Sequence, residues 1–262
     1  MLKHRLLFTL LSSNGTFMLS RNFRLQSVGD LKWLKDRYDF NAIAFSIDEL
    51  VVLNVERGSK NINVFCQNLL DLTKNCFIPI AAGGGIDNID VAYRLFNSGA
   101  DKLVINSILF KNPELVGELV TTFGGQSIIA SLDYKTSDNE NVVYIENGQI
   151  STGLRLEEAV KRVVALGVGE IYVTSIERDG TGQGFDLATL KRITELSPIP
   201  IIASGGVGRF DQLVMGIENA GVQAVSTANL FNFMADGLIE ARSFMKEKGI
   251  ALAEWDMKIQ AP

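Results

Sequence analysis

Pro200-Ile201-Ile202-Ala203-Ser204-Gly205-Gly206-Val207 is the stretch that decides the fold, because a near copy, Pro79-Ile80-Ala81-Ala82-Gly83-Gly84-Gly85-Ile86, stands about 121 residues earlier. Each copy is a short apolar run that ends in small residues and glycines. This pattern is typical of a buried parallel strand followed by a tight turn. Glycines in such a turn let backbone N–H groups approach a bound anion closely. The two copies predict a duplicated strand-and-turn unit.

Further similarities, at offsets of 121 or 122 residues, extend the repeat over the whole chain. The matching stretches are Glu49–Gly58 with Glu170–Asp179, Asn97–Ala100 with Asn219–Val222, and Thr9–Ser12 with Ser131–Tyr134. An internal repeat of this length indicates two copies of one structural unit. We therefore expect one domain over residues 1–262, built from half-barrels at about 1–123 and 124–262.

The spacing of apolar segments predicts eight strands, each followed by a helix. The strands are expected at Arg5–Leu11, Glu49–Val55, Phe77–Ala82, Lys102–Asn106, Ser127–Asp133, Glu170–Ser175, Ile199–Ala203 and Gln223–Ala228. The helices are expected at Leu31–Tyr38, Asn61–Asn75, Asn88–Asn97, Pro113–Phe123, Arg155–Leu166, Asp186–Leu196, Arg209–Asn219 and Met234–Lys248. This alternation is typical of a (β/α)8 TIM barrel. Residues 12–30 are expected to form a lid loop or an irregular excursion, and residues 134–152 an inserted hairpin.

Composition limits the class of function. The chain has 262 residues, 47% of them hydrophobic, and a net charge of −5, so it has no basic surface for nucleic acid or an anionic membrane. No signal peptide or membrane span is predicted. Two cysteines without metal-ligand spacing and a single histidine, His4, argue against a metal site. We expect a cytoplasmic protein without a metal or cofactor, whose cysteines are packing residues.

Reactive groups of a barrel lie at the C-terminal ends of its strands. Two anion sites are expected there, facing each other, so that a substrate with a phosphate at each end would fit. The first uses Gly84, Gly85, Asn106 and Ser107, and the second uses Asp179, Gly180, Gly205, Gly206, Ala228 and Asn229. The alternative interpretation is that the glycines serve only the tight turns.

Asp133 ends the fifth predicted strand and is the candidate general acid or base. A carboxylate at this position is costly unless it is used or paired; the alternative interpretation is that Asp133 caps the following turn. Asp179 is a second candidate catalytic carboxylate, beside the second anion site. The repeat partner of Asp133 is Leu11, so a symmetric mechanism with two equivalent carboxylates is excluded.

Four charged residues stand at the starts of strands, at the opposite end of the barrel. They are Arg5, Glu49, Lys102 and Glu170. Such charges commonly stabilise the floor of a barrel. The alternative is a salt-bridged ring that closes the bottom of the barrel and gates a central passage.

Over essentially its whole length the chain resembles the cyclase subunit of imidazole glycerol phosphate synthase, the HisF family. The resemblance lies in Asp48–Val51, Gly83–Ile86, Gly99–Lys102, Thr174–Ile176, Arg178–Thr181 and Ile201–Gly206. It implies a heterodimer in which a HisH-like glutaminase docks under the barrel and releases ammonia through a charged gate. The residues Arg5, Glu49, Lys102 and Glu170 match that gate, and Asp101 matches a position of the subunit interface.

The chain departs from the family at three functional positions. The family's catalytic aspartate of the first strand falls on Leu11, the lysine of its lid loop on Leu19, and an aspartate ending the second strand on Asn54. Because leucine cannot transfer a proton, efficient ring closure is not expected. The pattern resembles the divergent branch found with surface-polysaccharide genes, where an ammonia-delivering pair is associated with converting an acetamido sugar to an acetamidino sugar.

Three functions remain open at this stage. The first is an ammonia-accepting synthase subunit acting in lipopolysaccharide or O-antigen biosynthesis on a phosphorylated or nucleotide-linked substrate. The second is the cyclase of histidine biosynthesis, working despite Leu11. The third is a catalytically silent barrel that activates the glutaminase.

Overall fold

The computed structural model describes residues 3–40, 43–74, 76–229 and 232–254. Within these ranges eight parallel strands form a closed barrel, because β10 pairs with β7 and completes the circle. In order around the barrel, the strands are β1 (Arg5–Ser13), β4 (Glu49–Asn54), β5 (Ile80–Gly83), β6 (Lys102–Ile105), β7 (Ile128–Ser137), β10 (Glu170–Ser175), β11 (Ile201–Ser204) and β12 (Ala224–Thr227). The predicted (β/α)8 barrel is confirmed.

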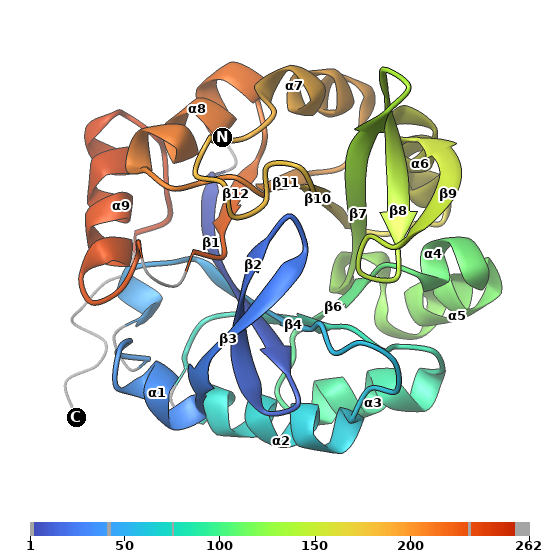
Figure 1. The fold of residues 1–262 in the computed structure, drawn as a ribbon, viewed down its shortest axis with the longest axis horizontal. Helices are drawn as coiled ribbons and strands as arrows, with labels where there is room; N and C mark the ends of the chain where they lie inside the picture. Colours follow the sequence, from blue (N-terminus) through green and yellow to red (C-terminus); the bar gives the residue numbers. More distant parts are fainter. Residues whose placement is uncertain (1–2, 41–42, 75, 230–231, 255–262) are drawn as a thin grey trace.

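Helices surround the barrel (Figure 1). The longer ones are α2 (Ile62–Thr73), α3 (Ile89–Asn97), α5 (Pro113–Phe123), α6 (Leu156–Ala165), α7 (Leu187–Leu196), α8 (Phe210–Ala220) and α9 (Gly237–Glu247). They lie on the predicted segments and differ only near their ends; Asn75, the predicted end of α2, lies outside the described residues. The short helix α4 (Ile108–Lys111) was not predicted.

Helix α1 (Leu31–Lys35) ends before the predicted Tyr38. The chain leaves the helix there and buries Tyr38 and Phe40, each 4% exposed, in the core. The Tyr38 ring packs 5.2 Å from that of Phe8 on β1. Burial of two aromatic side chains therefore outweighs continuation of a short amphipathic helix.

Successive side chains of each barrel strand point alternately outward and inward, which produces two separate hydrophobic cores. Outward-facing residues pack against the helices and form the larger core, which also contains the free thiols Cys66 and Cys76. Inward-facing residues fill the barrel interior with a smaller apolar cluster, made of Leu7, Val51, Ala81, Val104, Ile129, Tyr172, Ile202 and Ala224. The interior is thus packed rather than open, as in other barrels of this size.

Residues 12–30 form a β-hairpin and not the expected loop. Strand β2 (Thr16–Arg21) pairs with the end of β1, and β3 (Arg24–Asp30) pairs with β2. The tip residues Asn22 and Phe23 have φ values of 51° and 62°, as required for a tight two-residue turn. The many polar residues hide the strand pattern in the sequence, because much of the hairpin is exposed to solvent.

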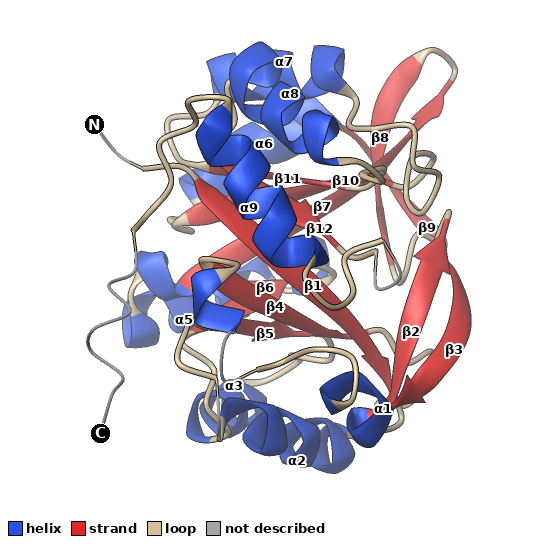
Figure 2. Ribbon diagram, turned by 90° about the vertical axis from the view of Figure 1, so that its left-hand side faces the viewer, coloured by secondary structure: helices blue, strands red, loops and turns tan. Residues whose placement is uncertain are grey.

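A second antiparallel extension covers the expected insertion at 134–152. Strand β7 continues past Asp133 to Ser137, and β8 (Glu140–Ile145) and β9 (Ile150–Arg155) are added to it. Figure 2 shows both extensions on the same side of the barrel. They meet over its mouth, because a Cβ atom added to Gly148 would lie 2.9 Å from the Phe23 ring at the tip of the first hairpin.

Candidate active site at the barrel mouth

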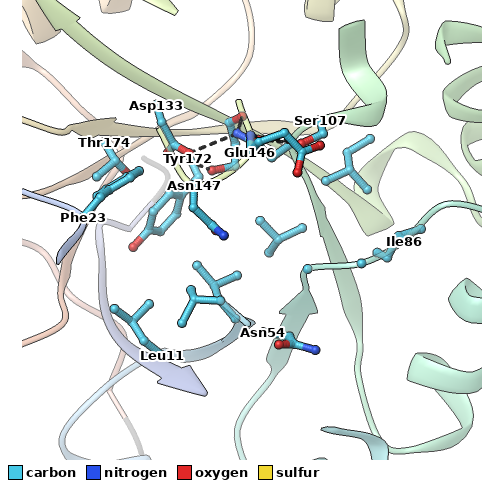
Figure 3. A pocket seen from close by; sticks show the side chains of 18 of the residues that line it. Leu11, Phe23, Asn54, Ile86, Ser107, Asp133, Glu146, Asn147, Tyr172 and Thr174 are labelled. Atoms are coloured by element: carbon cyan, nitrogen blue, oxygen red, sulfur yellow. Dashed lines mark hydrogen bonds between the residues drawn. The ribbon is translucent and has the colours of Figure 1, made fainter. Parts of the chain in front are cut away.

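A cavity of about 360 Å³ lies at the C-terminal ends of the strands, beneath the two extensions. The candidate residues that line it include Leu11, Asn54, Gly84, Gly85, Asn106, Ser107, Asp133, Asp179 and Ala228. Figure 3 shows that Leu11 and Asp133 lie on different sides of this cavity. This position agrees with the topology, because β1 and β7 are separated by three strands on either side of the barrel.

Asp133 is held by hydrogen bonds from neighbouring side chains. The Asn106 amide nitrogen donates to Asp133 Oδ2 at 3.1 Å and to the Ser131 carbonyl at 3.0 Å. The Ser131 hydroxyl donates to Asp133 Oδ1 at a longer 3.4 Å. Asn106, predicted only as an anion ligand, is therefore also a residue that orients Asp133.

Burial raises the pKa of Asp133 to about 7. The nearby charge of Asp179 acts in the same direction, whereas the hydrogen bonds that Asp133 accepts act against it. A carboxyl group that titrates near neutral pH can both accept and return a proton during one reaction cycle. The environment of Asp133 thus suits an acid–base role.

Asp179 is engaged by the hairpin rather than free in the cavity. The Ser20 hydroxyl donates to Asp179 Oδ2, and the backbone N–H of Phe23 donates to the same oxygen at 3.1 Å. Burial raises the pKa of Asp179 above its ordinary value. The structure therefore gives Asp179 a clear part in docking the hairpin over the mouth.

The side of the cavity formed by β1, β4 and the hairpin is mostly apolar. Its apolar residues are Leu11, Phe23, Leu25, Leu53 and Val55, and the polar residues of the same elements that line the cavity are Thr9, Ser20 and Asn54. Asn54, at the end of β4, is 4% exposed and its side-chain oxygen accepts the backbone N–H of Glu56 at 3.1 Å. Leu19 lies outside this cavity, on the other face of the hairpin. At the mouth, Asp133 therefore faces an apolar wall instead of a second carboxylate.

The predicted anion sites lie in two adjoining cavities, and Asp179 and Ala228 of the second site line both. Gly84, Gly85, Asn106 and Ser107 line the cavity already described. Gly180, Gly205, Gly206, Ala228 and Asn229 line a second cavity of about 320 Å³. The hairpin β2–β3 contributes residues to both cavities.

Close backbone packing alone requires glycine at these turns. A Cβ atom at Gly84 would lie 2.1 Å from the Asn54 carbonyl oxygen, and one at Gly206 would lie 2.3 Å from that of Gly184. Gly180 is covered by the hairpin, and a Cβ atom at Gly180 would lie 2.0 Å from the Ser20 carbonyl oxygen. These glycines are consistent with anion binding, but their presence does not depend on it.

Two lysines near the first anion site were not singled out from the sequence. The Lys60 ammonium donates to the carbonyl oxygens of Asn54 and Glu56 at 3.1 and 2.5 Å, and its burial lowers its pKa. Lys111 forms an ion pair of 2.6 Å with Glu146 of the second extension. The signal in the sequence was weak, because only folding brings residue 146 next to residue 111.

At the other end of the barrel the four predicted charges form a closed ring. Arg5 binds Glu49 at 2.8 Å and also binds Glu170, while Lys102 binds Glu170 at 2.6 Å and Glu49 at 3.2 Å. The side chains of Arg5 and Lys102 are 25% and 20% exposed. The ring therefore closes the floor of the barrel and is accessible from outside.

The two glutamates of the ring are not equally compensated. Burial raises the pKa of Glu49 despite the charges of Lys102 and Arg5, and its Oε1 atom has no hydrogen-bond partner among the described residues. Burial would also raise the pKa of Glu170, but the hydrogen bonds and charges of Arg5 and Lys102 hold it below its ordinary value. Asp101, next to the ring, accepts the backbone N–H of Ile80 at 2.8 Å.

Tyr172 occupies the barrel between the ring and the mouth. It is 2% exposed, and its hydroxyl lies 2.8 Å from those of Thr9 and Ser204 and 3.1 Å from that of Ser226. The signal for this residue was present in the sequence, since Tyr172 stands two positions after Glu170 and so shares its inward face.

These features define the class of protein as a (β/α)8 barrel with a titratable site at its mouth and an ion-paired floor. Comparisons then identify the family. A family model described as a histidine biosynthesis protein matches residues 38–235. The chain belongs to this family, and its curated relatives include HisF subunits of imidazole glycerol phosphate synthase.

Three relatives illustrate the similarity. A Parasynechococcus marenigrum (strain WH8102) protein, provisionally named imidazole glycerol phosphate synthase subunit hisF2, is 40% identical over 258 residues, covering 98% of this chain and 96% of the relative. The HisF subunit of Chloroherpeton thalassium is 37% identical over 205 residues, covering 78% and 82%. That of Pyrobaculum aerophilum is 34% identical over 237 residues, covering 90% and 92%.

In the described part of the chain, no three or more His, Cys, Asp or Glu side chains are grouped so that they could hold a metal ion. None of the helices described here has the length and apolar character needed to span a bilayer.

Proposed function

We propose that this chain is the ammonia-accepting synthase subunit of a glutamine-dependent enzyme pair, and that it acts on an acetamido sugar in surface-polysaccharide biosynthesis. Its partner is a HisH-like glutaminase that docks under the barrel, beside Asp101. One observation carries the proposal: the floor has the complete ring of Arg5, Glu49, Lys102 and Glu170, whereas Asp133 at the mouth faces Leu11.

The ring supports the ammonia-accepting part of the proposal. Four charges at the floor are expensive to bury and are only partly compensated, since Glu49 retains an oxygen without a hydrogen-bond partner. A floor needed only for stability would be served as well by apolar residues. An entrance that must open for a small polar molecule needs groups that can exchange hydrogen bonds.

The mouth supports an acceptor other than the histidine-pathway substrate. Converting an acetamido group to an acetamidino group replaces the amide oxygen with nitrogen, so that oxygen must first be activated. We assign the activation to a phosphoryl donor such as a nucleoside triphosphate on a third protein. Ammonia forms the new C–N bond, Asp133 accepts a proton from the adduct, and the oxygen leaves as phosphate. These reaction steps need only one carboxylate. The acetamido methyl group would pack on the wall of the cavity that contains Leu11.

Tyr172 imposes a condition on the proposal. It stands between the ring and the mouth within a packed interior. Ammonia can pass only if this side chain moves, which exchanges its hydrogen bonds with Thr9, Ser204 and Ser226 for others.

The substitution Lys102→Ala tests the entrance. Loss of Lys102 leaves Arg5 as the one cation that bridges Glu49 and Glu170, so the ring is open on one side and the floor should no longer control entry. We expect glutamine-dependent turnover to fall by about tenfold or more, a change of about 1.4 kcal/mol. Turnover with added ammonium salt should stay within about twofold of the wild type, because ammonia then reaches the mouth from solvent.

The matched control is Lys32→Ala, which removes an equally charged lysine paired with Asp36 on the exposed surface of α1. It should change neither activity. Equal losses of glutamine-dependent and ammonium-dependent turnover in Lys102→Ala would show that the ring is only a structural floor.

A histidine-pathway cyclase is the second candidate, favoured by the names of the relatives. It is separated from the first by assaying the wild type and Leu11→Asp with ammonium salt and the histidine-pathway substrate. We expect no turnover by the wild type and measurable turnover by Leu11→Asp, because the new carboxylate would face Asp133 across the cavity. Efficient turnover by the wild type would instead establish the cyclase.

A further inference from the structure

The two faces of the hairpin β2–β3 serve different cavities. Its cross-strand pairs are Leu19 with Gln26, Ser20 with Leu25, and Arg21 with Arg24. Paired residues share a face and successive pairs alternate between faces. Leu25 accordingly lines the cavity that contains Asp133, and the other two pairs line the second cavity, while Ser20 lies at the border and lines both. The hairpin, which crosses the mouth in Figure 1, therefore lies over the border between two adjoining cavities, which share Ser20, Asp179, Ser204 and Ala228.

The second cavity is lined by glycine turns and by two arginines. Its lining includes Gly180, Gly205 and Gly206 from the loops after β10 and β11, together with Arg21 and Arg24 from the hairpin tip. At about 320 Å³ it is a substantial space. It lies within the size range of small-molecule sites in proteins.

Arg21 and Arg24 are unusual neighbours. They stand directly opposite each other on one face of the hairpin, an arrangement that is destabilising for like charges. Both are exposed, and within the described ranges neither has an ion-pair partner. Two uncompensated guanidinium groups beside one cavity are a ready site for an anion, because their planar donors match phosphate oxygens.

The hairpin tip is fixed in place, so these arginines have a defined position. On one side of Arg21, the Ser20 hydroxyl donates to the Asp179 carboxylate; on the other, the Asn22 backbone N–H donates to the Asp179 carbonyl oxygen at 2.9 Å. Asp179 is the one carboxylate among the described residues that line this cavity. Its Oδ2 atom accepts hydrogen bonds from the Ser20 hydroxyl and the Phe23 backbone N–H. The carboxylate therefore holds the hairpin and forms no ion pair with either arginine.

The first anion site provides the contrast. Its two lysines are already satisfied, Lys60 by backbone carbonyl groups and Lys111 by Glu146. Uncompensated cations are thus found at the second cavity and not at the first. This asymmetry argues against two equivalent single phosphates.

We propose that the second cavity binds two adjacent phosphates, as in a nucleoside-diphosphate-linked compound. One phosphate lies at the glycine turns of Gly180, Gly205 and Gly206, and the other lies between Arg21 and Arg24. The inference deepens the proposed function by naming the class of its acceptor: the sugar would extend past the hairpin toward Asp133, and the nucleoside would point away from it. A single phosphate would leave the arginine pair unused.

Titration calorimetry in magnesium-free buffer tests this proposal. The probes are UDP compared with UMP, and ADP compared with AMP. Each pair shares its nucleobase, so a difference in affinity within a pair comes from the second phosphate. For the wild type we expect each diphosphate to bind roughly 10–100-fold more tightly than its monophosphate, because the second phosphate gains charge-assisted hydrogen bonds. The double variant Arg21→Gln/Arg24→Gln should lose this preference.

Two controls keep the experiment decisive. Lys191→Gln removes one positive charge from the exposed surface of α7 and should retain the preference. The melting temperature of the double variant should not fall, since a repulsive pair is removed, so lost binding cannot be attributed to misfolding. Equal affinity for diphosphates and monophosphates, a preference that survives in the double variant, or no binding of any nucleotide would overturn the proposal.

Failure of this proposal can be told apart from failure of the proposed function. Lys102→Ala and Asp133→Asn should both keep the diphosphate preference, because neither residue lines the second cavity. If amination is absent while the preference is present, the diphosphate site stands alone. If amination is present and unchanged in the arginine variant, only the diphosphate site is excluded.

Discussion

Replacing Asp133 with asparagine is expected to lower ammonium-dependent amination by about 10²–10⁴-fold, the usual contribution of a general acid or base. Asparagine keeps the shape of the side chain and can still accept the hydrogen bond from Asn106. It cannot accept a proton at neutral pH. At a constant concentration of free ammonia, the wild-type rate should rise as pH increases through about 7, because the base must be ionised, and this rise should be absent from the residual activity of the variant.

The same substitution should make the protein more stable at high pH. The pKa of Asp133 is raised from 3.8 to about 7 in the folded state, so its stabilising contribution is complete below 3.8 and is lost as pH rises through about 7. The full displacement corresponds to about 4 kcal/mol. Thermal unfolding should therefore show a larger gain for Asp133→Asn at pH 8 than at pH 5. A lower activity without this pH-dependent gain would indicate simple structural damage.

The substitution Arg242→Met is expected to cost about 3–5 kcal/mol of the free energy of unfolding. Arg242 of α9 forms a bidentate ion pair with Asp48 at 2.9 Å for both bonds, and the two side chains are 5% and 4% exposed. Asp48 also accepts the backbone N–H of Leu6 at 2.8 Å. Removing the arginine leaves a buried carboxylate without its counter-ion. Urea unfolding measures the loss.

A double variant shows whether the buried charge is the cause. In Asp48→Asn/Arg242→Met the carboxylate is neutral, and asparagine can still accept the Leu6 N–H. We expect it to recover most of the loss seen with Arg242→Met alone. If the double variant is as unstable as the single one, the loss comes from packing at α9 and not from charge.

The parts of the site that could be predicted are those that depend on residues close together in the chain and on the barrel topology. Arg5, Glu49, Lys102 and Glu170 begin their strands, so in a closed barrel their side chains share the inward face and the same end. Asp133 was found in the same way, as a charged residue ending an apolar strand. Both inferences need only the local strand pattern and the barrel topology.

Residues 12–30 were not predictable in this way. Polar residues on both faces of the hairpin conceal its alternation, and its position depends on partners far along the chain. Ser20 binds Asp179, which lies 159 residues away, and Asn22 binds the Ile176 carbonyl oxygen, 154 residues away. No local pattern in the sequence encodes such pairs.

The sequence by itself determined the barrel, the charged ring at its floor and the position of Asp133 opposite Leu11. These features follow from strand periodicity, which is a local property, and from an internal repeat, which is recognised by comparing two stretches of the same sequence. Only the tertiary structure decided that the mouth is divided by a hairpin, that Asp179 is bound to that hairpin, and that Arg21 and Arg24 face a cavity of their own. The physical reason is barrel closure, which brings the first and last thirds of the chain into contact.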